Sequence, residues 1–259
     1  MEIQKYKTMK KTKIIAVANH KGGVGKTTTV ASLGSILANQ GHSVLLIDLD
    51  AQANLTSSLT KIEPDETVYD LLTGRINYLP VLHISDGLSL LPASLSLAVV
   101  DVELSTAIAR ERILANALRE LANEVYDYIL IDCPPSLGLM TLNAFTACTD
   151  IIIPLMSEVL PFKGLTMINN FINMVNTRLN PGAHISGVVL TRWENCKLSK
   201  EIETRLREAM GGLVLTTKIR KNVRIAEAPL ESQNIVDYAP DSNGARDYQE
   251  LAKEIIQKL

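Results

Sequence analysis

The side chains best suited to chemistry lie in one glycine-rich segment, residues 21–28, between an apolar run and a predicted helix. Glycines let a backbone turn tightly, so that successive N–H groups point at phosphate oxygens, and a helix N-terminus adds partial positive charge. Lys26 can reach the terminal phosphates of a nucleotide, and the Thr27 hydroxyl can bind Mg²⁺. The segment predicted to bind these phosphates comprises Lys21, Gly22, Gly23, Val24, Gly25, Lys26, Thr27 and Thr28.

Three aspartates follow apolar runs and could serve a metal ion or a water molecule. Asp132 ends one run, and in folds where strands alternate with helices this position lies near the phosphate loop. A carboxylate there suits a Mg²⁺ site, because Mg²⁺ keeps several of its waters and needs few protein ligands. Asp48 ends another run, and Asp50 follows two residues later.

The elements that must position these residues alternate between short apolar runs and helical patterns. Most of the runs are continuous in Val, Ile and Leu, which is typical of strands buried on both faces of a parallel sheet. The alternation predicts a doubly wound α/β fold, a mostly parallel sheet with helices on both faces. The expected strands are Lys13–Asn19, Ser43–Asp48, Leu88–Leu91, Tyr128–Asp132, Asp150–Pro154, Ile185–Thr191 and Leu213–Thr217. The expected helices are Lys26–Asn39, Ala107–Asn123, Lys163–Leu179, Ser199–Met210 and Gly244–Leu259.

Composition narrows the class of protein. Of 259 residues, 46% are hydrophobic, enough to build a sizeable core, and we expect one domain over residues 12–259 after a flexible extension, residues 1–11. The net charge of −2 excludes a global basic field, so any nucleic-acid site must be local. Three scattered cysteines favour a reducing compartment. No stretch approaches the roughly 20 apolar residues of a membrane span, and we expect a cytoplasmic protein with no membrane partner.

Four motifs together resemble one family. Lys21 at the start of KGGVGKTT matches the deviant Walker A motif of the ParA/MinD superfamily, and the chain is most similar to the short Soj-like ParA proteins. Residues 48–54 (DLDAQAN), 128–135 (YILIDCPP) and 221–229 (KNVRIAEAP) are similar to that family's later motifs. The resemblance implies a P-loop NTPase fold and hydrolysis of ATP with Mg²⁺.

The same resemblance implies a set of roles. Lys26 and Asp50 would act in hydrolysis, and Lys21 would reach across an ATP-dependent homodimer to the partner's phosphates. Thr27, Asp48 and Asp132 would serve Mg²⁺. Thr191, Lys221 and Asn222 would lie on the side of the base. Arg220 departs from the pattern, since the family usually has a proline there.

A basic stretch bears on the partners. Residues 192–224 hold nine basic and four acidic side chains, a local charge of +5. In Soj-like proteins, basic residues of these elements bind double-stranded DNA without sequence preference, which implies Lys197, Lys218, Lys221 and Arg224 here. A lysine is adequate for such binding, because it contacts phosphate as a point charge. The resemblance also implies a nucleoid-associated protein and a ParB-like adaptor that stimulates hydrolysis, while the cargo, whether chromosome, plasmid or another body, stays open.

Two other functions compete with this interpretation. A MinD-like protein of the membrane surface needs a basic amphipathic C-terminal helix. The last expected helix places Tyr248, Leu251, Ile255 and Leu259 on one face but carries few basic residues, so we expect it to pack on the core. An iron–sulfur ATPase would need Cys133 and Cys148 as ligands, but Cys133 directly follows Asp132, unlike the pattern of that family, and we expect small buried thiols.

Overall fold

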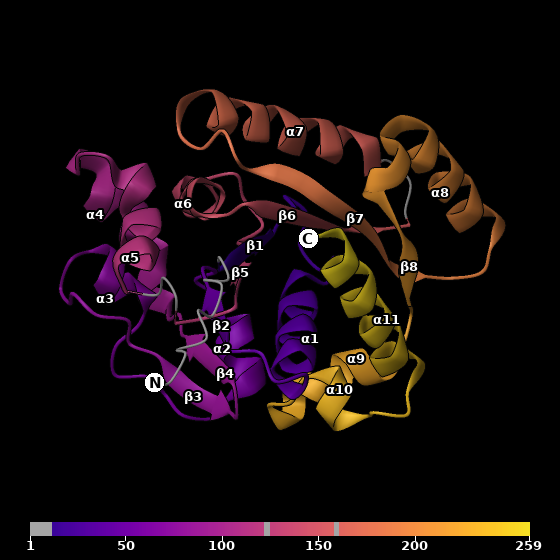
Figure 1. Ribbon diagram of the computed structural model, residues 1–259, viewed down its shortest axis with the longest axis horizontal. Coiled ribbons are helices and arrows are strands. Elements are labelled where there is room, and N and C mark those ends of the chain that lie inside the picture. The colour runs from indigo at the N-terminus through magenta and orange to yellow at the C-terminus, as the bar shows by residue number, and fades with distance from the viewer. Residues whose placement is uncertain (1–11, 122–124, 158–160) are drawn as a thin grey trace, which may run out of the picture.

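The centre of the computed structural model is one twisted sheet, which has eight strands among the described residues (Figure 1). The structure describes residues 12–121, 125–157 and 161–259, so the predicted extension, residues 1–11, lies outside the described residues. The strand order is β3-β4-β2-β5-β1-β6-β7-β8. The strands are β1 (Lys13–Val17), β2 (Val44–Asp48), β3 (Leu82–Ser85), β4 (Leu88–Leu91), β5 (Tyr128–Asp132), β6 (Asp150–Met156), β7 (His184–Trp193) and β8 (Val214–Arg220).

All pairings between described strands are parallel except β3 with β4. Every residue of β2 and β5 is buried, as expected of strands covered on both faces. The two strands pair in register, so that Asp48 lies beside Asp132 at the carboxyl edge of the sheet. The predicted doubly wound, mostly parallel α/β fold is confirmed, and the antiparallel edge strand β3 is an addition that the sequence did not predict.

Helices cover both faces of the sheet. They are α1 (Lys26–Asn39), α2 (Asn54–Leu59), α3 (Val68–Leu72), α4 (Val100–Glu103), α5 (Ile113–Leu121), α6 (Leu139–Ala147), α7 (Pro161–Arg178), α8 (Lys197–Met210), α9 (Val223–Glu227), α10 (Ile235–Tyr238) and α11 (Asn243–Lys258). Short 3-10 turns are η1 (Leu95–Val99), η2 (Leu104–Thr106), η3 (Arg110–Arg112), η4 (Gly211–Leu213) and η5 (Ala228–Glu231).

Each face has its own apolar core. One core joins the sheet to α3, α5, α6, α7 and α8, and the other joins it to α1, α10 and α11. In Figure 1, α6 and α7 lie above the sheet, and α1 and α11 lie below it. The C-terminal helix α11 buries Tyr248, Leu251 and Ile255, so its apolar face packs on the core as predicted. None of the helices in the described residues combines the length and the apolar character that a bilayer crossing requires.

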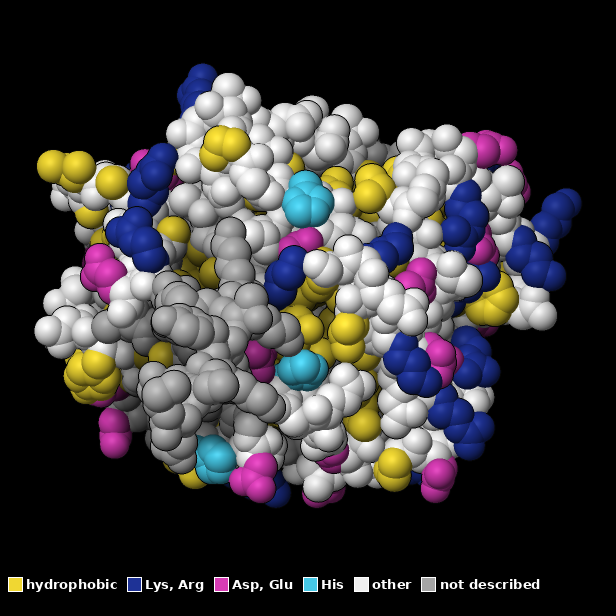
Figure 2. Space-filling view, in the orientation of Figure 1, with side chains coloured by type: hydrophobic (Ala, Val, Ile, Leu, Met, Phe, Trp, Pro, Cys, Tyr) yellow, Lys and Arg dark blue, Asp and Glu magenta, His cyan; other side chains and the backbone are white. Residues whose placement is uncertain are grey.

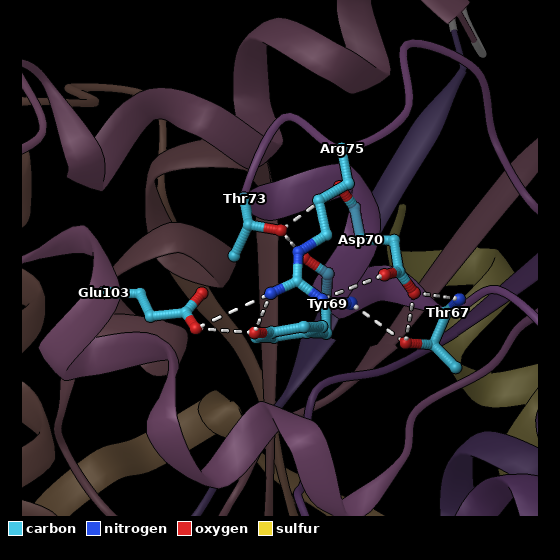
Figure 3. A network of polar contacts seen from close by, with 6 residues as sticks. All are labelled: Thr67, Tyr69, Asp70, Thr73, Arg75 and Glu103. Atoms are coloured by element: carbon cyan, nitrogen blue, oxygen red, sulfur yellow. Dashed lines mark hydrogen bonds and ion pairs between the residues drawn. The ribbon is translucent and has the colours of Figure 1, made fainter.

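A polar network connects residues 67–75, a segment for which the sequence predicted no helix or strand, with Glu103 (Figure 3). Thr67 and Asp70 cap the start of α3 reciprocally, and the side chain of Asp70 also pairs with Arg75 at 3.8 Å. The Tyr69 hydroxyl donates to Glu103 on α4 at 2.7 Å, while the Arg75 guanidinium lies 4.6 Å from the centre of the Tyr69 ring. These contacts join α3 to α4 at the edge of one core, away from the glycine-rich loop.

Candidate functional site

The glycine-rich loop runs from the carboxyl end of β1 into α1. Gly25 adopts φ 90° immediately before the helix, a left-handed conformation that favours glycine. Before the loop, the Asn19 amide donates to the Pro154 carbonyl at 2.7 Å and its oxygen accepts the Lys21 N–H at 3.1 Å. Asn19 therefore ties the first residue of the loop to β6, a contact that no sequence motif indicated.

Two further side chains brace the loop from neighbouring elements. The Thr191 hydroxyl at the end of β7 donates to the Val24 carbonyl at 2.8 Å, and both residues are buried. The Tyr248 hydroxyl of α11 lies 3.3 Å from the Thr29 hydroxyl, which donates to the Gly25 carbonyl at 2.7 Å. The resemblance implies that Thr191 lies on the base side, whereas its hydroxyl in this structure holds the phosphate loop. Tyr248 was predicted only as a core residue.

The two lysines of the loop differ in exposure. Lys26 is buried, and its ammonium donates to the Lys21 carbonyl at 3.3 Å. Burial lowers the pKa of Lys26, although the carboxylates of Asp132 and Asp50 oppose the shift. An anion bound in the loop would stabilise the charged form of this lysine. The Lys21 side chain is exposed, as a residue that acts on a second subunit would be.

Thr27 and Asp132 form the pair that fits a magnesium ion. The Thr27 hydroxyl donates to Asp132 Oδ2 at 2.6 Å, while Asp132 Oδ1 is buried without a hydrogen-bond partner among the described residues. The pKa of Asp132 is raised well above its usual range, mainly by burial and to a smaller extent by the nearby Asp48 carboxylate. A cation, or a water bound to one, would satisfy the unpaired oxygen and favour the ionised carboxylate. Few protein ligands are needed, because Mg²⁺ keeps several of its waters.

Asp48 organises the chain that carries Asp50. One Asp48 oxygen accepts the Asp50 N–H at 3.1 Å, and the other accepts the Thr56 N–H at 2.9 Å and hydroxyl at 2.8 Å. Burial raises the pKa of Asp48 to about 6, against the lowering effect of these hydrogen bonds. Asp50 is partly exposed, and its Oδ1 accepts the Gln52 N–H at 3.0 Å.

A cavity of about 410 Å³ lies beside the loop. Its lining combines predicted phosphate-binding residues and Asp50 with six residues of the segment 225–235, which runs from α9 to the start of α10 and forms the second wall. The lining residues are Gly22, Gly23, Gly25, Lys26, Thr27, Thr28, Ala31, Ser32, Asp50, Gln52, Asn54, Ser57, Ser58, Pro135, Ile225, Ala228, Pro229, Gln233, Asn234 and Ile235. The second wall is mostly apolar, with the amides of Gln233 and Asn234 at its end, as suits the base of a nucleotide. No sequence motif indicated Gln233 or Asn234 as site residues. The only available signal was that an asparagine before two apolar residues, as at Asn234, is typical of a helix N-cap.

The predicted base-side residues lie next to this wall rather than in it. Asn222 caps α9 by accepting the Arg224 N–H at 2.9 Å, and Lys221 pairs with Glu194 at 3.0 Å. Arg220, in place of the family's usual proline, pairs with Asp247 of α11 at 2.5 Å.

Figure 2 shows Lys and Arg side chains, interspersed with acidic ones, on the side of the molecule where Figure 1 places α8, β8 and α9, and these elements carry the predicted DNA-contacting residues Lys197, Lys218 and Arg224. Lys218 pairs with Glu203 at 2.7 Å and lies 4.8 Å from the centre of the Trp193 ring, and Arg224 pairs with Glu227 at 2.9 Å. Lys197, the first residue of α8, is exposed and has no carboxylate at ion-pair distance within the described part of the chain. The same holds, within those residues, for Arg192 and Lys200.

The three cysteines differ in burial. Cys133 and Cys148 are buried in the apolar core, and burial raises the pKa of both thiols. Cys196 is exposed. The expectation that Cys133 and Cys148 are small buried thiols is confirmed, which speaks against an iron–sulfur cluster held between subunits.

Known proteins of one family are similar to this chain over most of its length. The family model described as "AAA domain" matches residues 12–185. The chain is 41% identical to the sporulation initiation inhibitor protein Soj of Bacillus subtilis, over 94% of this chain and 98% of the relative. It is 39% identical to the chromosome-partitioning ATPase Soj of Treponema pallidum, over 95% and 98%. A solved structure described as cobyrinic acid a,c-diamide synthase from Mycobacterium smegmatis, with a bound ATP analogue and magnesium, matches with TM-score 0.82 and 35% identity, over 95% of each chain.

These matches settle the activity as well as the fold. The chain is an ATPase, its cofactors are ATP and Mg²⁺, and its function is that of a partition ATPase, which these matches favour over a MinD-like function. Family membership also implies an ATP-dependent dimer and partner proteins. The chain belongs to the Soj-like group of the ParA/MinD superfamily of deviant Walker A ATPases.

Proposed function

We propose that this ATPase dimerises on ATP, binds DNA without sequence preference in that state, and positions a cargo with a ParB-like partner. The observation that carries the DNA part is the exposed start of α8, where Lys197 and Lys200 have no carboxylate partner among the described residues. Relatives named for chromosome partitioning support the same reading.

The proposed nucleotide site uses the cavity beside the loop. The backbone N–H groups of residues 22–28 would hold the triphosphate, together with the Lys26 ammonium, which in this structure donates to the Lys21 carbonyl. Thr27 and Asp132 would hold Mg²⁺, which when bound would supply positive charge beside the phosphates. Asp48 serves the metal side and fixes the backbone of Asp50, which orients the attacking water.

The proposed dimer completes each site in trans. Lys21 is exposed at the mouth of the loop, and its side chain would reach the phosphates bound by the partner subunit. A positive charge placed there offsets charge that develops on the transferred phosphoryl group. Hydrolysis would remove the terminal phosphate that both subunits contact, so the dimer would dissociate more readily.

The start of α8 is suited to contact DNA phosphates. A cation in the first turn of a helix faces the positive end of the helix dipole, so Lys197 and Lys200 disfavour rather than stabilise α8. The same helix end attracts an anion. Their placement is therefore explained by an external negative partner. Lys218, Lys221 and Arg224 would add contacts, but each must first exchange the carboxylate that it now binds.

The proposal extends to location and partner. A cytoplasmic protein that binds DNA only as an ATP dimer would associate with the nucleoid, and a ParB-like adaptor that stimulates hydrolysis would release it locally. One subunit offers few phosphate contacts. Two subunits on one rigid body make the second contact effectively intramolecular, which explains why dimerisation would control binding.

A salt titration of DNA binding tests the proposal. Binding to two unrelated duplexes should require ATP and weaken with salt, and Lys197→Ala should lower the log–log slope by about 1.8, because each dimer loses two phosphate contacts. Lys253→Ala is the matched control, since Lys253 lies on the exposed face of α11 and pairs with Glu250 at 2.7 Å. Equal binding with ATP and ADP, or an unchanged slope for Lys197→Ala, would contradict the proposal.

A further inference from the structure

The segment that forms the second wall of the cavity is anchored at two ends. At its far end, Asn234 caps α10 by accepting the N–H groups of Val236 and Asp237, and Ile235 is buried. The Ser35 hydroxyl of α1 donates to Asp237 at 3.2 Å and ties α10 to the helix that follows the phosphate loop. Most side chains between the anchors are exposed, with Val223 67% and Leu230 79% exposed, while Ala228 is buried.

At its near end, the anchor is an ion pair with α11. The Asp247 carboxylate accepts the Arg220 backbone N–H at 2.9 Å and the Arg220 Nε at 3.1 and 3.0 Å. The Arg220 guanidinium adds a contact of 2.5 Å to Asp247 Oδ1. The Asp247 side chain is only 10% exposed, while that of Arg220 is 45% exposed. This carboxylate thus holds both the backbone and the side chain of the residue at which the wall segment leaves β8.

The same turn of α11 also reaches the phosphate loop through α1. The hydroxyl of Tyr248, the next residue, lies 3.3 Å from the Thr29 hydroxyl of α1, which donates to the Gly25 carbonyl of the loop at 2.7 Å. One turn earlier, Gly244 allows Ile225 of the cavity wall to pack closely, because a Cβ at position 244 would lie 3.0 Å from Ile225 Cγ1. Consecutive residues of α11 therefore fix the phosphate loop and the facing wall relative to each other.

We propose that Arg220 and Asp247 form a positioning pair that holds the wall of residues 225–235 against the ribose and base of the nucleotide. The inference rests on the proposed seating of the triphosphate in the loop, because the base end must then lie away from Lys26 and towards this wall. Neither residue touches the nucleotide. The pair fixes the end of β8, from which the chain continues into the wall. It therefore strengthens binding of the base and ribose and leaves binding of the phosphates unchanged.

Two ligands separate these contributions: MgATP, which has a base, and inorganic tripolyphosphate with Mg²⁺, which has none. Calorimetry would measure the binding of both to Arg220→Gln, Asp247→Asn and the double variant. Each single variant should bind ATP about fivefold or more weakly, the scale of a lost charge-assisted pair, with tripolyphosphate affinity changed by less than about twofold. The double variant should be no worse than either single variant, since the pair acts as one unit.

Control variants keep the outcome clear. Arg220→Lys retains the charge and should recover part of the ATP affinity. Glu250→Gln breaks an exposed pair on the same helix and should change neither ligand. Equal losses for ATP and tripolyphosphate, or no loss for ATP, would overturn the positioning role. A wild-type chain that bound ATP but not tripolyphosphate would instead refute the seating of the phosphates, and with it the inference.

Discussion

The contact between Thr191 and the phosphate loop leads to a sharp prediction. The Thr191 hydroxyl donates to the Val24 carbonyl at 2.8 Å, and the two residues are 2% and 1% exposed. Thr191→Val keeps the branched shape of the side chain but removes the donor. The Val24 carbonyl then stays buried without this hydrogen bond, in the middle of the segment that turns its N–H groups to the phosphates.

The magnitude follows from the cost of an unsatisfied buried group. Such a group costs about 1–3 kcal/mol. If the whole cost falls on the binding conformation of the loop, nucleotide affinity falls by about 5- to 150-fold. If part of it is expressed as lost stability, the melting temperature falls by about 2–4 °C per kcal/mol for a chain of this size.

Binding of ATP and of inorganic tripolyphosphate to the Thr191→Val variant would measure the effect, together with thermal unfolding. Because the hydroxyl holds the loop, both ligands should weaken by the same factor. Thr191→Ser keeps the donor and should bind close to wild type. A loss confined to ATP would show that Thr191 acts at the base, as the resemblance implies. Unchanged affinity and stability would refute the bracing role.

Three further predictions concern the metal side, the dimer and the C-terminal helix. Asp132→Asn should raise the Mg²⁺ concentration needed for hydrolysis by about tenfold or more, since outer ligands of a metal are worth that factor; an unchanged Mg²⁺ titration would remove Asp132 from the site. Lys21→Ala should still bind ATP but hydrolyse it slowly, and mixing with Asp50→Ala should restore turnover in mixed dimers; no recovery, once mixed dimers are demonstrated, would argue against action in trans. Burial opposes ionisation of Glu254, but hydrogen bonds from the Thr216 and Thr217 N–H groups outweigh it and lower the pKa of Glu254 below its ordinary value of 4.5. The stability that ionised Glu254 contributes is therefore present above pH 4.5 and is lost as the pH falls through the lower pKa of the folded state. Glu254→Gln should unfold at a lower denaturant concentration than wild type near pH 7, and at the same concentration in acid. A loss of stability that stays constant with pH would contradict this.

Much of the sheet was predictable because buried parallel strands are continuous apolar runs. The ranges predicted for β4 and β5 match the observed strands, and the predicted first helix has the bounds of α1. The edge strand β3 was missed because its burial alternates weakly over only four residues. The helix predicted from Ala107 begins instead at Ile113, since Ala109 adopts φ 54° and a 3-10 turn precedes α5.

Helices made by tertiary contacts were harder to predict. The nine residues of α6 are apolar or small on most sides, so that no periodic face marks a helix. The five-residue helix α3 depends on the capping of Thr67 by Asp70 and on contacts to Glu103, which lies far along the chain.

The candidate site also has a part that the sequence predicts and a part that it does not. The phosphate loop was predictable, because it is a motif of consecutive residues whose types indicate the phosphate contacts. Its supports come from other elements: Asn19 reaches β6, and Tyr248 arrives from the last helix. The sequence also could not show that one Asp48 oxygen accepts the Asp50 N–H, while the other accepts the N–H and hydroxyl of Thr56 on α2.

The charge count of residues 192–224 overstated the number of basic side chains that are not already paired with a carboxylate and could contact DNA. Lys218 and Arg224 contribute to the local charge of +5 but are paired in the fold, whereas Lys197 has no such partner within the described residues. Pairing depends on distances between elements, which a count along the sequence does not contain.

The central claim, that ATP closes a dimer and Asp50 acts only in the hydrolysis that opens it, is tested most directly by the mass of the Asp50→Ala variant in solution. Light scattering with saturating ATP and Mg²⁺ should give a stable dimer of about twice 28.4 kDa, and with ADP a monomer. Lys26→Ala should stay monomeric in both. An Asp50→Ala protein that remains monomeric in saturating ATP, or is equally dimeric in ADP, would contradict the account.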